Sequence, residues 1–187
     1  MSVSVVAETG ARGRTRRAIV EAAISVITDN PAATLSDIAE VAGVGRSTLH
    51  RHFPERTDLL RAVALQVHAA SNAAIEAADP TCGPVLAALR RVVEGHLDLG
   101  PIFVYIYTEP TIQADPELAA HLDTGDEVIA EILARASADK PAYPPGWARR
   151  VFWSLLLAGY DAIKQDGTPR HQVVDAIMHS LTKGTIT

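Results

Sequence analysis

The central segment of the chain reads Thr34-Leu-Ser-Asp-Ile-Ala-Glu-Val-Ala-Gly43-Val-Gly-Arg-Ser-Thr-Leu-His-Arg-His-Phe53-Pro-Glu-Arg-Thr-Asp-Leu-Leu60. Thr34 is a good helix N-cap, and Asp37 three residues later completes a weak form of the capping box. Apolar residues then recur at helical spacing: Leu35, Ile38, Ala39 and Ala42. Gly43 can adopt the left-handed conformation that ends a helix. The segment therefore predicts a short helix between Thr34 and Gly43.

A second short helix follows. Val44 is the apolar residue that the turn places inside, and Pro54 ends the helix because it disfavours helical geometry at Phe53. Two short helices joined by a Gly-containing turn are typical of a helix-turn-helix. Helical periodicity places Leu49 and Phe53 on the inner side. It leaves a polar outer face made of Arg46, Ser47, Thr48, His50 and Arg51.

This outer face suits a polyanionic partner. No Asp or Glu occurs from Val41 to Pro54, whereas a solvated helix surface usually carries Glu and Lys. Residues near the start of a recognition helix contact base edges in the DNA major groove. We therefore predict that Ser36, on the preceding helix, and the five residues of the outer face contact double-stranded DNA.

The runs Ile38–Val44 and Ser47–Phe53 resemble the TetR family of transcriptional regulators, closely from about Arg14 to Leu60. The resemblance implies an all-α fold. Residues 1–60 would form a three-helix helix-turn-helix DNA-binding domain, and residues 61–187 a helical effector-binding and dimerisation domain. It also implies that Arg56, where the family commonly carries Lys, binds a DNA phosphate.

The same resemblance implies the function. It predicts a homodimeric, ligand-responsive regulator, most simply a repressor that an unknown small-molecule effector releases from a palindromic operator. The recognition helices of the two subunits would lie about 34–36 Å apart. An alternative is an all-helical carrier of a small ligand or metal, in which the helix-turn-helix has lost its function. A carrier has no reason to keep a polar face without carboxylates.

The distribution of charge agrees with DNA binding at one end of the chain. The net charge is −5, yet residues 1–60 hold seven Arg against seven Asp or Glu. Residues 61–187 hold ten Lys or Arg against fifteen Asp or Glu. A cluster of arginines precedes the helix-turn-helix: Arg12, Arg14, Arg16 and Arg17. It is either a second DNA contact or a solvated basic tail.

The rest of the chain reads as helices separated by Pro-rich and Gly-rich breaks. The apolar periodicity predicts helices over residues 14–28, 57–78, 84–99, 116–138, 147–165 and 170–183. Residues 102–107 favour a strand by propensity. A lone strand among helices has no partner, so we predict a helix there.

The helix over residues 147–165 is apolar on most of its circumference. Such a helix is buried on more than one side. We therefore predict a homodimer through a four-helix bundle of the last two helices, with Ala158-Gly159 allowing the subunits to approach closely.

The aromatic residues of the second domain predict either a core or an effector pocket. The family resemblance favours a pocket lined by His96, Phe103, Tyr105, Tyr107 and Trp153. His68, His96 and His121 could converge on a metal, but they lack a dense set of carboxylates, so we predict no metal site. The sequence has no phosphate-binding loop, nucleophile elbow or paired-Cys motif, so we expect no enzyme, catalytic residue or cofactor.

The single Cys82 cannot form an internal disulfide, which favours a reducing compartment, and we expect it to be buried as a small apolar residue. No apolar run is long enough to span a membrane. The N-terminus lacks the basic start of a secretion signal. The sequence therefore predicts a cytoplasmic protein.

Overall fold

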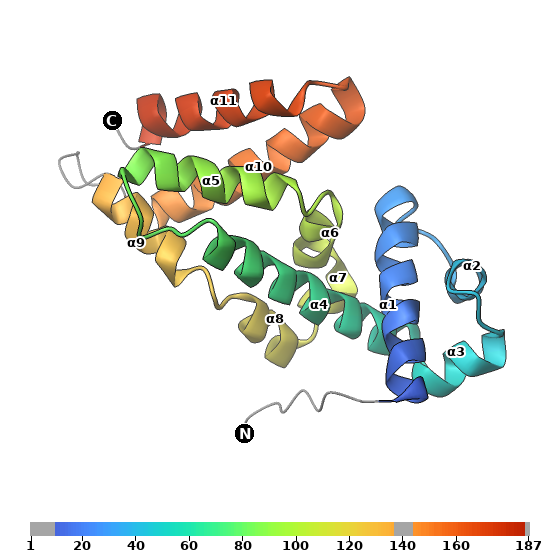
Figure 1. Ribbon diagram of the computed structural model, residues 1–187. Coiled ribbons are helices and arrows are strands. Elements are labelled where there is room, and N and C mark those ends of the chain that lie inside the picture. The colour runs from blue at the N-terminus through green and yellow to red at the C-terminus, as the bar shows by residue number, and fades with distance from the viewer. Residues whose placement is uncertain (1–9, 137–143, 186–187) are drawn as a thin grey trace.

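The computed structural model describes residues 10–136 and 144–185, and all regular structure in these residues is helical (Figure 1). The predicted all-α fold is confirmed. Three helices lie together at one end of the molecule: α1 (Ala11–Asp29), α2 (Leu35–Val41) and α3 (Arg46–His52). No helix in the described ranges is both long and apolar enough to cross a membrane.

The helix α4 (Arg56–Ala77) connects this end to the rest of the molecule. It packs against α1 at its start and against α5 (Val85–Leu97), α6 (Ile102–Thr108), α7 (Pro110–Gln113) and α8 (Pro116–Leu122). The helices α9 (Glu127–Ala136), α10 (Trp147–Asp166) and α11 (Arg170–Ser180) complete the body, and a π-helical turn (Leu181–Thr185) follows. Figure 1 shows α5, α10 and α11 stacked at the far side from α2 and α3.

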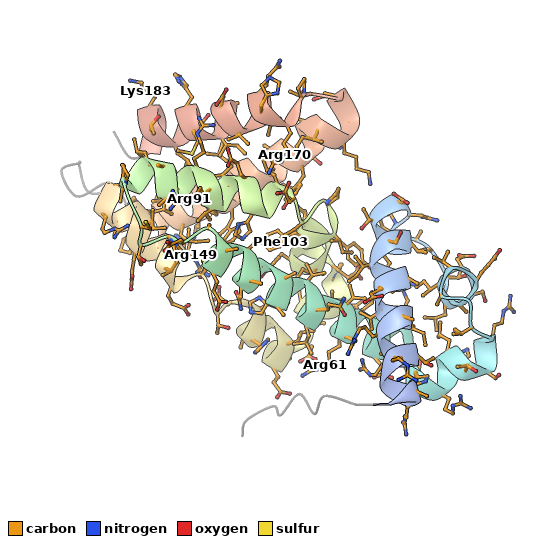
Figure 2. All side chains as sticks on the ribbon, viewed as in Figure 1. Arg61, Arg91, Phe103, Arg149, Arg170 and Lys183 are labelled. Carbon is orange, nitrogen blue, oxygen red and sulfur yellow. The ribbon has the colours of Figure 1, made fainter. Side chains whose placement is uncertain are left out.

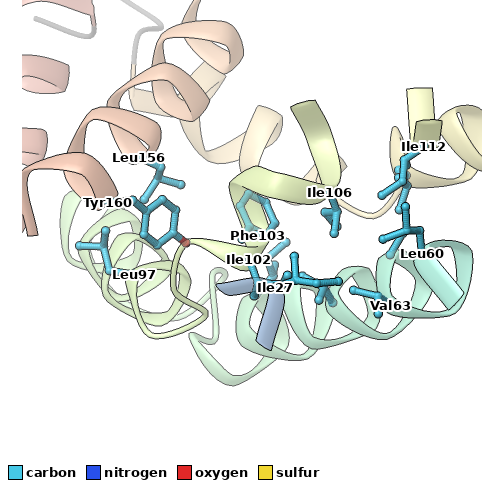
Figure 3. Packing of buried hydrophobic residues seen from close by; sticks show 14 of the residues in the cluster. Ile27, Leu60, Val63, Leu97, Ile102, Phe103, Ile106, Ile112, Leu156 and Tyr160 are labelled. Carbon is cyan, nitrogen blue, oxygen red and sulfur yellow. The ribbon is translucent and has the colours of Figure 1, made fainter. Parts of the chain in front are cut away.

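The buried apolar residues form one cluster that runs through both parts of the chain. Figure 3 shows Ile27 of α1 beside Val63 of α4 and Ile102 of α6. All three side chains are at most 4% exposed. The helices that carry the helix-turn-helix are therefore packed onto the body, without a linker between them.

The segment 102–107 is helical, as predicted, within α6. Its β-branched and aromatic residues are compatible with a helix because Ile102, Phe103 and Ile106 are buried on one face. Tertiary packing outweighs strand propensity here.

The prediction of one continuous helix over residues 116–138 was wrong. The chain leaves helical geometry between Leu122 and Glu127, where Gly125 has a φ of +89°. A β-carbon at Gly125 would lie 2.4 Å from Oδ1 of Asn72, so the turn is pressed against α4. Residues 137 and 138 lie outside the described part of the chain. This turn carries Asp126 into the interior, where it is buried.

The C-terminal end of α4 is fastened by Arg91 of α5. Its Nε donates to the carbonyl oxygen of Ala78 at 2.7 Å, and its Nη2 donates to those of Asp79 and Cys82 at 2.8 and 2.9 Å. One side chain thus satisfies three carbonyl groups that follow the helix. The side chain of Cys82 is exposed, so its predicted burial was wrong.

Gly159 of α10 allows close packing within the subunit. Its missing side chain would point at α11 and α5, since a β-carbon there would lie 2.9 Å from Cγ1 of Val173 and 3.0 Å from Cδ1 of Ile177. The sequence predicts that Ala158-Gly159 lets two subunits approach closely. Gly159 is instead buried inside its own chain, and only Ala158 is exposed.

Replacing Gly159 with Val is expected to destabilise the fold by about 1–3 kcal/mol, because the added methyl groups overpack the contact with α11. Urea denaturation at a fixed protein concentration measures this change. Ala120→Val, at an exposed position of α8 away from the proposed dimer contact, is the control and should cost less than about 1 kcal/mol. Equal losses in the two variants would contradict the packing role of Gly159.

Candidate DNA interface and internal cavity

The start of α2 has the capping arrangement that the sequence predicted. The backbone N–H of Asp37 donates to Oγ1 of Thr34 at 3.3 Å, and the backbone N–H of Thr34 donates to the Asp37 carboxylate at 2.7 Å. The backbone N–H and the hydroxyl of Thr34 both donate to the Asp37 carboxylate, and they hold the pKa of Asp37 below its ordinary value. Gly43 ends the helix region with a φ of +65°, as predicted. The turn between α2 and α3 is therefore specified by local sequence.

The inner side of α3 is also as predicted. Leu49 and Phe53 are each 1% exposed, and Val44 packs half-buried against the same core. The guanidinium of Arg16, from the Arg cluster on α1, lies 4.6 Å from the centre of the Phe53 ring. This cation–π contact fixes α3 against α1.

The outer face of α3 points to solvent. Four of its predicted DNA contacts are exposed: Arg46, Ser47, His50 and Arg51. Thr48, and Ser36 of α2, are half-buried. In the described residues of α3 the side chains offer donors and no carboxylate. The five predicted contacts on α3 therefore form a polar face of this helix, which lies with α2 at one end of the molecule (Figure 1).

Arg56, predicted to bind a DNA phosphate, is half-buried at the start of α4. Its guanidinium donates to the carbonyl oxygens of Ala33 and Pro31, in the loop between α1 and α2. The side chains of Tyr105 and Glu109 line the same shallow hollow. Arg56 therefore connects the loop before α2 to the start of α4, and its phosphate contact stays a prediction.

Arg56→Met is expected to reduce stability by about 1–2 kcal/mol, because two backbone carbonyls lose a charged donor. If Arg56 also binds a phosphate, the substitution lowers the salt slope of DNA binding by about one. Fluorescence anisotropy across a salt series, with thermal unfolding in parallel, separates these effects. An unchanged slope would refute the phosphate role of Arg56.

An internal cavity of about 370 Å³ opens between α4, α6, the α8–α9 turn and α10. Three of the predicted ligand-binding residues line it: Phe103, Tyr107 and Trp153. The rings of Phe103 and Trp153 are stacked, with centres 5.4 Å apart and planes 28° apart. The Tyr107 ring lies 4.9 Å from that of Phe103. The size and aromatic lining are those of a site for a small organic molecule.

Two predicted ligand-binding residues do not line this cavity. His96 is fully buried, with its Nε2 3.0 Å from Oγ of Ser71 and its Nδ1 2.9 Å from the carbonyl oxygen of Val92. Burial lowers the pKa of His96, so it acts as a neutral hydrogen-bonded part of the core. Tyr105 faces the separate hollow beside Arg56. One sequence does not reveal which side of a short buried helix faces a cavity.

The cavity also contains charged residues that sequence reasoning missed. The carboxylate Oδ2 of Asp126 accepts hydrogen bonds from Nε of Arg149 at 2.6 Å and from Nε1 of Trp153 at 2.9 Å. Nη2 of Arg149 donates to Asp123 at 2.8 Å. Burial, and then the charge of Asp126, raises the pKa of Tyr107 to about 12. The Asp-Thr-Gly-Asp sequence of the turn was the one available signal for this group.

The histidines of the second part of the chain do not assemble a metal site. The rings of His68 and His121 are 5.2 Å apart, and Nδ1 of His68 lies 3.2 Å from the Tyr107 hydroxyl. His96 is bound elsewhere, to Ser71. Across residues 10–136 and 144–185 no three His, Cys, Asp or Glu residues are grouped closely enough to hold a metal ion.

Comparison with known proteins agrees with this architecture. Residues 19–63 match the family model described as bacterial regulatory proteins, tetR family. The HTH-type transcriptional repressor LfrR of Mycolicibacterium smegmatis is 69% identical over 180 residues, which are 96% of this chain and 95% of LfrR.

Solved structures give the same result. The crystal structure of LfrR from Mycobacterium smegmatis in complex with proflavine has a TM-score of 0.85 at 68% identity, covering 93% of this chain and 98% of that one. A second LfrR crystal structure has a TM-score of 0.73 at 60% identity, covering 91% and 99%. The chain is thus a ligand-responsive, DNA-binding transcriptional regulator, and it belongs to the tetR family of bacterial regulatory proteins.

Proposed function

We propose that this protein is a dimeric repressor that binds a palindromic operator and leaves it when a small aromatic molecule occupies the cavity. The observation that carries the proposal is the continuity of α4. Its residues His68, Ser71 and Asn72 line the cavity, and the same helix begins at the helix-turn-helix with Arg56. A molecule that displaces α4 would therefore displace the DNA-reading surface.

The DNA contacts that we propose are Ser36, Arg46, Ser47, Thr48, His50 and Arg51, with Arg56 at a phosphate. We keep the division into a DNA-binding part, residues 1–60, and an effector-binding part, residues 61–187, although α4 crosses that boundary. A regulator of this kind works on the chromosome, and we place it in the cytoplasm.

Dimerisation through α10 and α11 is supported by the apolar surface that α10 leaves uncovered. Leu157 is 39% exposed and Trp147 is 44% exposed. Val151, Leu155 and Ile163 of the same helix are only half-buried within the chain. Contact between two copies would remove this surface from water, at about 25 cal/mol for each Å² of apolar area.

The aromatic lining of the cavity supports an aromatic effector. LfrR was crystallised with proflavine, and the cavity here has Phe103 and Trp153 stacked beside Tyr107. An effector shifts the protein towards the released state only to the extent that it binds that state more tightly. We therefore expect proflavine and operator DNA to weaken each other's binding by the same factor.

The test is fluorescence anisotropy of labelled DNA from the intergenic region beside the protein's own gene, titrated with protein and then with proflavine. Proflavine also intercalates into DNA, so an unrelated repressor with its own operator is measured at the same dye concentrations. Release from the first operator only supports the proposal. Light scattering at micromolar concentration should give a dimer. A monomer, or operator binding unaffected by saturating proflavine, would refute it.

A further inference from the structure

Arg149 and Asp126 form an ion pair on the wall of the cavity. Nε of Arg149 donates to Oδ2 of Asp126 at 2.6 Å, and Nε1 of Trp153 donates to the same oxygen at 2.9 Å. Figure 2 labels Arg149 and Phe103, which project from two different helices that border the cavity. The cavity thus holds a flat cationic group, the guanidinium, beside an aromatic lining.

The two carboxylates that bind Arg149 lie at different depths. The side chain of Asp126 is 12% exposed, whereas that of Asp123 is 73% exposed. Arg149, at 34% exposed, donates to both. The guanidinium therefore bridges the inner carboxylate of Asp126 and the outer carboxylate of Asp123. If it moved away from Asp126, it would keep its ion pair with Asp123.

A carboxylate as deep as that of Asp126 requires a positively charged or hydrogen-bonding partner, because an unpaired buried charge is strongly destabilising. Arg149 supplies the charge in this structure. Trp153 supplies a second hydrogen bond, which would remain if Arg149 moved away. A cationic ligand could therefore take the place of Arg149 and keep the carboxylate of Asp126 paired with a positive charge.

We propose that the effector is a flat aromatic cation whose charged group replaces Arg149 at Asp126, while Arg149 keeps its contact with Asp123. This inference rests on the proposed role of the cavity as the effector site. Asp126 is then the residue that selects for charge, and Arg149 is an internal competitor that lowers the affinity for every cationic ligand. Flat rings gain further stabilisation against Phe103 and Trp153.

The surrounding groups favour a cation over an anion. The other cavity arginine, Arg150, is exposed and donates to the carbonyl oxygen of Pro145. Burial lowers the pKa of His68 below its ordinary value of 6.5, so this residue adds no positive charge at neutral pH. An anionic ligand near Arg149 would meet the carboxylates of Asp123 and Asp126, which already occupy that guanidinium.

The test compares proflavine, a cation at neutral pH, with acridine, which has the same ring system and is uncharged at neutral pH. Isothermal titration calorimetry gives the affinity of each for the whole protein. Asp126→Asn should weaken proflavine binding by about tenfold or more and change acridine binding less than about twofold. Arg149→Gln should strengthen proflavine binding by about tenfold and leave acridine binding within about twofold.

Arg150→Gln is the matched control, since it removes the same charge from the adjacent position without touching Asp126. It should change proflavine affinity much less than Arg149→Gln does. The ¹⁵N spectrum of the arginine side chains provides a direct readout. The Nε–H signal of Arg149 should shift when proflavine binds and stay in place when acridine binds.

The outcomes separate this inference from the proposed function. Suppose that both dyes bind the wild-type protein and that each variant changes the affinity for both dyes by the same factor. The charge-selective role of Asp126 is then refuted, while the cavity remains the effector site. If neither dye binds, the effector site fails and the inference fails with it. If the Asp126→Asn variant does not fold, the proflavine affinity of Arg149→Gln and the ¹⁵N signal of Arg149 still test whether proflavine replaces Arg149 at Asp126.

Discussion

Replacing both Arg46 and Arg51 with Ala is expected to lower the affinity for the operator by about 100-fold or more. Both side chains are exposed on the outer face of α3, at the beginning and near the end of the helix. A bidentate contact between Arg and guanine contributes about 1–3 kcal/mol of discrimination. Two such losses amount to about 2–6 kcal/mol, a large part of the about 4–10 kcal/mol that separates specific from non-specific binding. Anisotropy titrations with the operator and with a scrambled duplex measure both affinities.

The control for this prediction is the pair Arg90→Ala and Arg135→Ala, which removes two positive charges from the body of the protein. Arg90 forms a surface ion pair with Asp175, and Arg135 of α9 donates to the carbonyl oxygen of Pro80. The control should leave operator binding nearly unchanged. If the α3 double variant loses equal affinity for operator and scrambled DNA, then Arg46 and Arg51 contact phosphates and do not read bases.

Replacing Phe53 with Ala is expected to cost about 3–5 kcal/mol of stability. The ring is 1% exposed, and Arg16 covers it at 4.6 Å. Its removal leaves a cavity beneath α3 and abolishes a cation–π contact. Because the buried cluster is continuous, the loss should appear in the unfolding of the whole chain, as a fall in Tm of roughly 6–20 °C.

Thermal unfolding by circular dichroism measures this fall, and Val41→Ala is the control. Val41 is an apolar residue that is 60% exposed on α2, so its truncation should change stability by less than about 0.5 kcal/mol. A Phe53 variant as stable as the wild type would show that α3 does not depend on this ring for its position.

Local signals explain why the helix-turn-helix was predictable from sequence. The Thr34–Asp37 cap, the positive φ of Gly43 and the stop at Pro54 each depend on residues within a few positions of one another. Such short-range chemistry is visible in a single sequence. The helical state of residues 102–107 was reached by a different argument, namely that a lone strand has nothing to pair with.

The features that were missed depend on contacts between distant residues. The hydrogen bonds of Arg56 to Ala33 and Pro31 join residues more than twenty positions apart in the sequence. His96 and Phe103 lie close together, and only the packing of α5, α6 and α10 determines which of the two faces the cavity. Asp126 enters the cavity because Gly125 breaks a helix that periodicity alone would continue.

Arg91 holds the C-terminal end of α4, so a rotation of this helix about its held end would move its N-terminal end, beside the helix-turn-helix, the most. Its 22 residues span about 33 Å at a rise of about 1.5 Å each. A tilt of about 5° around the fixed end would move the other end by about 3 Å, which is close to the rise of one base pair, about 3.4 Å. In the proposed dimer, a displacement of less than a bond length beside the cavity, close to the fixed end, would therefore become a shift of about one base pair between the two half-sites.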